Sequence, residues 1–156
     1  MPDNDKRGPG LRFPPPLLPV GLIAAAWLLQ QRAPLPLSST AQLWQFGLVT
    51  VAVALLLAIV ALVHFLRAKT HVEPWHPTST IIRNGIYRYS RNPIYLAFCI
   101  AAIGAAFIMN SWWGIIAVTP LAYLLQVLVI RKEEVYLEAK FGEPYLDYKR
   151  QVRRWL

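Results

Sequence analysis

The chain has 156 residues, of which 56% are hydrophobic, and its 16 basic and 8 acidic residues give a formal net charge of +8 at pH 7. That length allows one domain. Uncharged stretches of up to 39 residues exclude an ordinary soluble domain of this size.

Three long stretches of the sequence are almost free of charge. Residues 13–31 carry none, the only ionisable residue between 33 and 66 is His64, and residues 92–130 carry none. A bilayer core of roughly 30 Å is crossed by about 20 helical residues. The stretches therefore fit one, one and two spans, and the sequence predicts an all-α, polytopic membrane helix bundle.

The four predicted spans cover about residues 15–31, 43–66, 93–109 and 113–132. Prolines between positions 14 and 19 shorten the first helix, so partial insertion is an alternative there. The third and fourth spans are separated at residues 109–114 by Asn, Ser and Gly, which favour a turn, and by paired tryptophans, which favour a membrane–water interface. The last two spans are thus expected to form a hairpin.

The basic residues predict the orientation of these spans. Before, between and after the four spans they number 3, 1, 5, 0 and 7. Lys6, Arg7 and Arg12 form the first group, and Arg32 stands alone in the second. This alternation places both termini and the 67–92 loop in the cytoplasm, with the chain integral to the cytoplasmic (inner) membrane. It also explains the positive charge through topology and anionic headgroups, so no nucleic-acid partner is expected.

The histidines and the cysteine give little sign of a metal site or a nucleophile. Cys99 lies in the middle of a predicted span and is expected to be a small core hydrophobe. His64, His71 and His76 do not have a zinc-binding spacing on one helical face, so no metal is predicted. The N-terminus has no cleavable signal pattern.

The segment before the third span is rich in turn and cap residues. Asn84-Gly85 is a turn signal, and Asn92-Pro93 predicts an N-cap followed by proline at the first helical position. A helix beginning there presents free N–H groups and the positive end of its dipole, which suit an anionic group of a ligand. The alternative is that the tyrosines and arginines nearby only anchor the helix in headgroups. These are Tyr87, Arg88, Tyr89, Arg91 and Tyr95.

After the fourth span the sequence reads RKEEVYLEAKFGEPYLDY, with an adjacent pair of acids, Glu133 and Glu134. Neither has a basic residue four positions later, and both lie toward a helix C-terminus, where anions are unfavourable. Either Arg88 and Arg91 compensate them across the hairpin, or a cationic ligand does. Adjacent helical residues point about 100° apart, so one glutamate can pair with arginine while the other faces a ligand.

Phe141-Gly142 then predicts a helix end, and Pro144 starts a short amphipathic helix with Tyr145 and Tyr148. An interfacial anchor is the favoured interpretation of this C-terminal helix over a catalytic role. It can also serve as a lid.

Read together, these segments resemble the isoprenylcysteine carboxyl methyltransferase family in its small bacterial branch, and more distantly the phospholipid N-methyltransferases. The resemblance covers roughly residues 75–156. It rests on Thr80-Ile81-Ile82, Asn84-Gly85-Ile86-Tyr87, Arg91-Asn92-Pro93-Ile94-Tyr95, Glu133-Glu134, and Phe141-Gly142 with Tyr145 and Tyr148, in that order around a two-span hairpin.

The resemblance implies a methyltransferase that binds S-adenosyl-L-methionine and acts on a lipid-like or amphiphilic acceptor in the bilayer. It divides the chain into a cytoplasmic tail (1–14), two N-terminal spans (15–66) and a cofactor-binding core (75–156). By position, the implied catalytic residues are Arg131 and Glu134. The implied cofactor-binding residues are Ser79, Thr80, Ile81, Ile82, Tyr87, Asn92, Pro93, Ile94, Tyr95 and Glu133.

The sequence departs from the family pattern in three places. Asn92 stands where the family has histidine, Gly104 is the only glycine of the third span, and Arg131 is at an imperfect offset for a substrate-contacting arginine. Two other functions are weighed beside the methyltransferase. One is an NADPH-dependent membrane reductase of the related sterol-reductase type, and the other is a non-enzymatic scaffold in which Arg88 and Arg91 satisfy the acidic pair.

Overall fold

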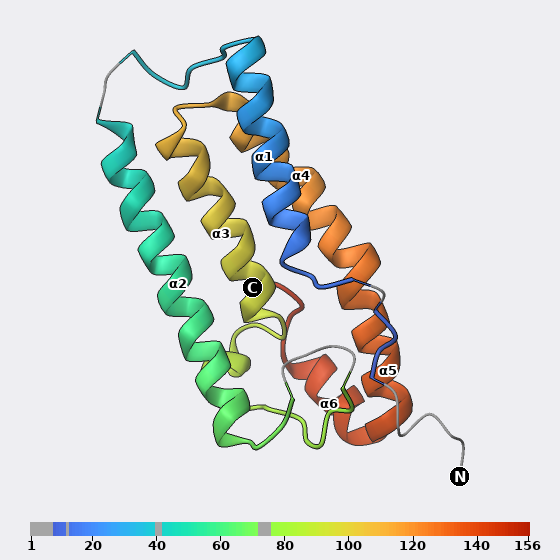
Figure 1. The fold of residues 1–156 in the computed structure, drawn as a ribbon. Coiled ribbons are helices and arrows are strands. Elements are labelled where there is room, and N and C mark those ends of the chain that lie inside the picture. The colour runs from blue at the N-terminus through green and yellow to red at the C-terminus, as the bar shows by residue number, and fades with distance from the viewer. Residues whose placement is uncertain (1–7, 12, 40–41, 72–75) are drawn as a thin grey trace.

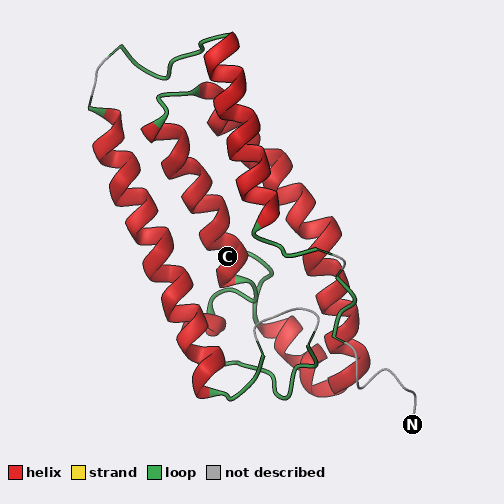
Figure 2. Cartoon of the chain, viewed as in Figure 1, coloured by secondary structure: helices red, strands yellow, loops and turns green. Residues whose placement is uncertain are grey.

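The computed structural model describes residues 8–11, 13–39, 42–71 and 76–156. Lys6, Arg7 and Arg12, which entered the charge count, lie outside them. The helices are α1 (Leu17–Arg32), α2 (Leu43–Arg67), α3 (Pro93–Ile108), α4 (Trp112–Leu124), α5 (Arg131–Phe141) and α6 (Glu143–Gln151). A short 3₁₀ helix, η2 (Gly85–Arg88), precedes α3, and a π-helical segment, η3 (Leu125–Ile130), joins α4 to α5. The described residues contain no strand (Figure 2), so the predicted all-α class is confirmed.

Four apolar helices, α1 to α4, form the bundle (Figure 1). Among the described residues, α2 and the continuous helix Trp112–Phe141 are long and apolar enough to cross a membrane, and α3 is a shorter apolar helix. Large apolar side chains cover the outer face of α2, where Val49 is 63% and Leu56 is 62% exposed. Such a surface suits lipid rather than water.

The hairpin between α3 and α4 turns where the sequence predicts it. Asn110 adopts a positive φ of 47°, and Ser111 is the residue before α4. The side chain of Asn110 accepts a hydrogen bond from the Ser38 N–H (3.0 Å) and donates one to the Ser38 carbonyl (2.8 Å). The turn is thereby tied to the segment between α1 and α2.

Helix α3 lies at the centre of the bundle, against α2 on one side and against α1 and α4 on the other (Figure 1). Small residues let α2 and α3 approach closely, as is common where membrane helices pack. A Cβ atom placed on Gly47 would lie 2.7 Å from the Gly104 carbonyl oxygen and 2.8 Å from the Ile108 nitrogen. Backbone atoms therefore limit what position 47 can hold.

We expect Gly47→Val to destabilise the bundle by about 1–3 kcal/mol, because the side chain would have to push two helix backbones apart. Gly21→Val is the matched control. Gly21 is also the fifth residue of its helix, and nothing lies within 4 Å of a Cβ placed there. Thermal unfolding in detergent measures both variants, and equal melting temperatures would contradict this description of the α2–α3 contact.

The fourth apolar helix runs past the predicted end at residue 132 to Phe141. Pro120 within α4 lacks the N–H needed for a regular helical hydrogen bond, and the wider π turns of η3 follow it. Leu121, Leu125 and Val129 of this helix are fully buried in a cluster that also holds the buried Cys99. One continuous helix, Trp112–Phe141, thus connects the bundle core to the acidic pair in α5.

The C-terminal helix α6 packs against the end of the bundle (Figure 1). The chain reverses at Gly142, whose φ is 59°, so the predicted helix end at Phe141 is confirmed. Tyr145 and Tyr148 of α6 are 3% and 5% exposed, whereas its Arg150 is exposed. The helix is therefore more than a surface anchor, because it buries two aromatic side chains.

Candidate functional site

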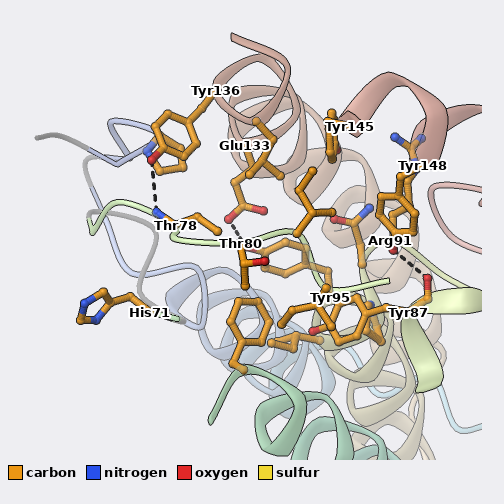
Figure 3. Close-up of a pocket in the computed structure, with 18 residues that line it drawn as sticks. His71, Thr78, Thr80, Tyr87, Arg91, Tyr95, Glu133, Tyr136, Tyr145 and Tyr148 are labelled. Atoms are coloured by element: carbon orange, nitrogen blue, oxygen red, sulfur yellow. Dashed lines mark hydrogen bonds between the residues drawn. The ribbon is translucent and has the colours of Figure 1, made fainter. Parts of the chain in front are cut away.

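A cavity lies where the segment before α3, the first turn of α3, α5 and α6 converge (Figure 3). Its empty volume is about 860 Å³, including the open space at its mouth. Like typical ligand pockets, it combines apolar walls with a few polar groups. The lining residues are Pro9, Phe65, His71, Thr78, Thr80, Ile81, Ile82, Tyr87, Arg91, Asn92, Pro93, Ile94, Tyr95, Glu133, Tyr136, Leu137, Tyr145 and Tyr148.

Nine of the ten predicted cofactor-binding residues line this cavity, and Ser79 does not. The Ser79 N–H donates to Thr70 Oγ1 at 2.9 Å, which fixes Ser79 against the loop after α2. The two predicted catalytic residues also lie outside the lining: Arg131 is exposed, and Glu134 is buried beside the lining residue Arg91.

Several lining residues were not among the predicted site residues, although helical periodicity points to two of them. Tyr136 and Leu137 follow Glu133 by three and four positions and therefore share its face of α5. The Tyr136 hydroxyl accepts a hydrogen bond from the Thr78 N–H at 3.2 Å (Figure 3). Phe65, from the last turn of α2, has no local sequence signal that places it here.

The first turn of α3 presents the predicted segment to the cavity. Pro93 is the first helical residue, as expected, and it is buried. Asn92 is the N-cap residue of α3, as predicted, but its side chain makes no capping hydrogen bond. Its Nδ2 instead donates to the Arg154 carbonyl at 2.9 Å, which ties the start of α3 to the C-terminal tail.

The two adjacent glutamates have separate environments. The Tyr95 hydroxyl donates a hydrogen bond to Glu133, which faces the cavity (Figure 3). Glu134 accepts two hydrogen bonds from Arg154, Nε to Oε1 at 2.9 Å and Nη2 to Oε2 at 2.7 Å. Arg91 Nη1 lies 3.1 Å from Glu134 Oε1. The negative charge of Glu134 is thus the one that arginine side chains neutralise.

Of the two arginines expected to neutralise the pair, only Arg91 does so. Arg88 is exposed, and the second arginine at Glu134 is Arg154. Arg154 lies 20 residues after Glu134, and no local residue pattern predicts that the two form a pair.

Three tyrosine hydroxyls at the cavity are kept protonated. Burial raises the pKa of Tyr145 to about 12, and burial also raises the pKa of Tyr87 and of Tyr148 well above the usual range. Tyr148 uses its hydroxyl to donate to the Tyr87 carbonyl at 2.7 Å. At neutral pH these side chains therefore act as hydrogen-bond donors rather than as anions.

Two lining residues hold buried donors without a hydrogen-bond partner among the described residues. These donors are the hydroxyl of Tyr87 and the Nε atom of Arg91, whereas Arg91 Nη1 is engaged in the ion pair with Glu134. Buried polar groups are nearly always hydrogen-bonded, and leaving one unpaired costs about 1–3 kcal/mol. The cavity thus combines unused donors with the carboxylate of Glu133, a set that suits a ligand with both an anionic and a cationic group.

The described residues hold no group of three His, Cys, Asp or Glu side chains placed to bind a metal ion. His71 lines the cavity, and its ring centre lies 4.9 Å from that of His76. The polar groups available to a ligand in the cavity are therefore mainly tyrosine hydroxyls, one carboxylate and one guanidinium.

Comparison with known proteins gives one family and several relatives. The phospholipid methyltransferase family model matches residues 43–144. A probable protein-S-isoprenylcysteine O-methyltransferase of Oryza sativa subsp. japonica is 30% identical over 112 residues, 70% of this chain and 59% of the relative. The protein-S-isoprenylcysteine O-methyltransferase of Dictyostelium discoideum is 28% identical over 119 residues, 75% of this chain and 50% of the relative.

An uncharacterized protein of Haemophilus influenzae is 44% identical over 46 residues, 30% of this chain and 68% of the relative. The matches to the rice and Dictyostelium proteins span only 59% and 50% of those relatives' lengths. The family match spans α2 to the first two residues of α6, so it includes all the lining residues except Pro9, Tyr145 and Tyr148.

Proposed function

Because the chain belongs to the phospholipid methyltransferase family, we propose that it is a membrane-embedded methyltransferase that uses S-adenosylmethionine and a lipid-like or amphiphilic acceptor. The observation that carries the proposal is the pairing of unused buried donors with a carboxylate in one cavity. The donors belong to Tyr87 and Arg91, and the carboxylate belongs to Glu133.

The charged groups of S-adenosylmethionine are complementary to the polar groups of this cavity. The cofactor's carboxylate suits the Tyr87 hydroxyl and the Nε atom of Arg91, and its ammonium and sulfonium cations suit the Glu133 carboxylate. Tyrosine rings around the cavity also favour a cation near their faces. The residues present therefore fit this cofactor without a metal ion.

S-Adenosylmethionine, when bound, supplies an electrophilic methyl group on its sulfonium sulfur. The chain's own contribution is to hold donor and acceptor in line and to exclude water. Such orientation is worth roughly 7–11 kcal/mol of a reaction barrier. A carboxylate or thiolate acceptor would need no general base.

The environment of Glu134 argues against its predicted catalytic role. Both of its oxygens are engaged by arginines, and it lies outside the cavity lining. We therefore assign Glu134 a structural role. If an amine acceptor has to lose a proton, the carboxylate inside the cavity is that of Glu133.

We also propose that the cavity opens to the cytoplasm and that both termini lie on that side of the inner membrane. Pro9, before α1, and Tyr145, in α6, both line the cavity, which supports placing the two ends of the chain at one face. The proposed core, residues 75–156, is completed by Phe65 of α2. An apolar acceptor would approach through the bilayer, while the cofactor arrives from water.

Tyr87→Phe tests the donors directly. We expect it to weaken S-adenosylmethionine binding by about two- to twelvefold, because one buried hydrogen bond to the ligand, worth about 0.5–1.5 kcal/mol, is lost. The melting temperature should stay near wild type, since the hydroxyl has no hydrogen-bond partner among the described residues. Calorimetric titration measures the affinity.

Tyr89→Phe is the matched control, because Tyr89 is two residues away and 75% exposed. Equal affinities for the two variants would show that the Tyr87 hydroxyl does not contact the cofactor.

A further inference from the structure

The five residues after α6, Val152–Leu156, form a tail that returns to the start of α3. The end of the chain lies beside the first turn of α3 (Figure 1). The Arg91 N–H donates to the Arg153 carbonyl at 3.0 Å, and Asn92 Nδ2 donates to the Arg154 carbonyl at 2.9 Å. Backbone atoms of the tail thus hold it against Arg91 and Asn92, which line the cavity.

Side chains of the tail contact α5 and η3. Arg154 grips Glu134 of α5 through two parallel hydrogen bonds of 2.9 and 2.7 Å. The indole nitrogen of Trp155 donates to Gln126 Oε1, within η3, at 3.1 Å. The tail therefore connects α3 with α5 and η3.

The contact between the Arg154 guanidinium and the Glu134 carboxylate is directional. A bidentate guanidinium–carboxylate pair fixes the plane of both groups, which a single point charge does not. The Glu134 side chain is only 7% exposed and that of Arg91 is 7% exposed, so water screens this cluster weakly. Arg154 itself is 30% exposed and reaches the cluster from outside.

Fixing Glu134 also fixes its neighbour. Glu133 and Glu134 point about 100° apart on one helix, so a rotation of α5 that moves one moves the other. Glu133 contacts Tyr95 in the first turn of α3, and Arg154 contacts Glu134. Two contacts on different faces thus set the rotation of α5.

We propose that Arg154 is a positioning residue, which clamps Glu134 so that the Glu133 carboxylate faces the cavity and its ligand. This inference rests on the proposed function for its ligand and on the tail contacts for its geometry. Arg154 lies outside the cavity lining, so it acts through Glu134 and not by touching the cofactor.

The test compares three variants in detergent: Arg154→Gln, Arg154→Lys and, as a charge-matched control, Arg153→Gln. Arg153 is exposed, and its observed contact is made by its backbone carbonyl. We expect Arg154→Gln to weaken S-adenosylmethionine binding at least fivefold and Arg154→Lys to restore part of the loss. Arg153→Gln should bind as wild type does. Affinity unchanged in Arg154→Gln would overturn the proposal.

Hydrogen–deuterium exchange supplies a readout that needs no ligand. Arg154→Gln should speed exchange at the amides of α5, residues 131–141, while Arg153→Gln leaves them unchanged. If wild type binds no S-adenosylmethionine, the proposed function fails, and exchange alone still decides whether Arg154 holds α5. Unchanged α5 exchange in Arg154→Gln would overturn the clamp itself.

Discussion

Replacing Glu133 by glutamine is expected to weaken S-adenosylmethionine binding by about 10- to 100-fold. Hydrogen bonds to a charged group contribute about 1.5–3 kcal/mol, and the amide keeps the shape but removes the charge. Glu133 is the only acidic residue that lines the cavity among the described residues. Its loss therefore removes the sole carboxylate there that could face the cationic part of the ligand.

Calorimetric titration of wild type and Glu133→Gln measures this difference. Glu138→Gln is the control, because Glu138 lies on the same helix, pairs with Lys149 and does not line the cavity. The melting temperature of Glu133→Gln should stay close to wild type, since glutamine can still accept the hydrogen bond of the Tyr95 hydroxyl. Wild-type affinity in Glu133→Gln would remove Glu133 from the cofactor site.

Replacing Glu134 by alanine is expected to cost about 3–5 kcal/mol of stability, because it leaves a buried positive charge without its partner. The charge is that of Arg91, whose side chain is 7% exposed. Arg154 would also lose both of its hydrogen bonds to the carboxylate. The effect should appear as a lower melting temperature and a lower midpoint in denaturant.

Glu138→Ala provides the comparison, since Glu138 is on the same helix and also forms an ion pair. Its side chain is 33% exposed and that of Lys149 is 35% exposed, so solvent screens the pair. Such pairs contribute about 0–1 kcal/mol. A Glu134→Ala protein as stable as Glu138→Ala would show that the cluster around Arg91 does not hold the fold together.

Much of the architecture could be predicted because uncharged stretches leave few alternatives in a bilayer. The hairpin turn at Asn110 and the start of α3 at Pro93 followed from local turn and cap chemistry. The adjacent glutamates also led to a correct division of roles, with one paired to arginine and the other facing the cavity.

The features that sequence reasoning missed depend on contacts between distant parts of the chain. Arg154 is 20 residues from Glu134 and approaches it only because the tail folds back over α3. The position of Arg131 outside the cavity depends on the rotation of α5, which the π turns of η3 help to set. Neither the tail path nor the helix rotation is encoded in a local residue pattern.

The central claim is that the cavity binds S-adenosylmethionine. Calorimetric titration of the purified wild-type protein in detergent tests it most directly, with NADPH titrated in parallel. We predict saturable micromolar binding of S-adenosylmethionine at one site and no binding of NADPH. Absence of S-adenosylmethionine binding to protein that unfolds cooperatively on heating would contradict the claim, and binding of NADPH instead would favour a reductase.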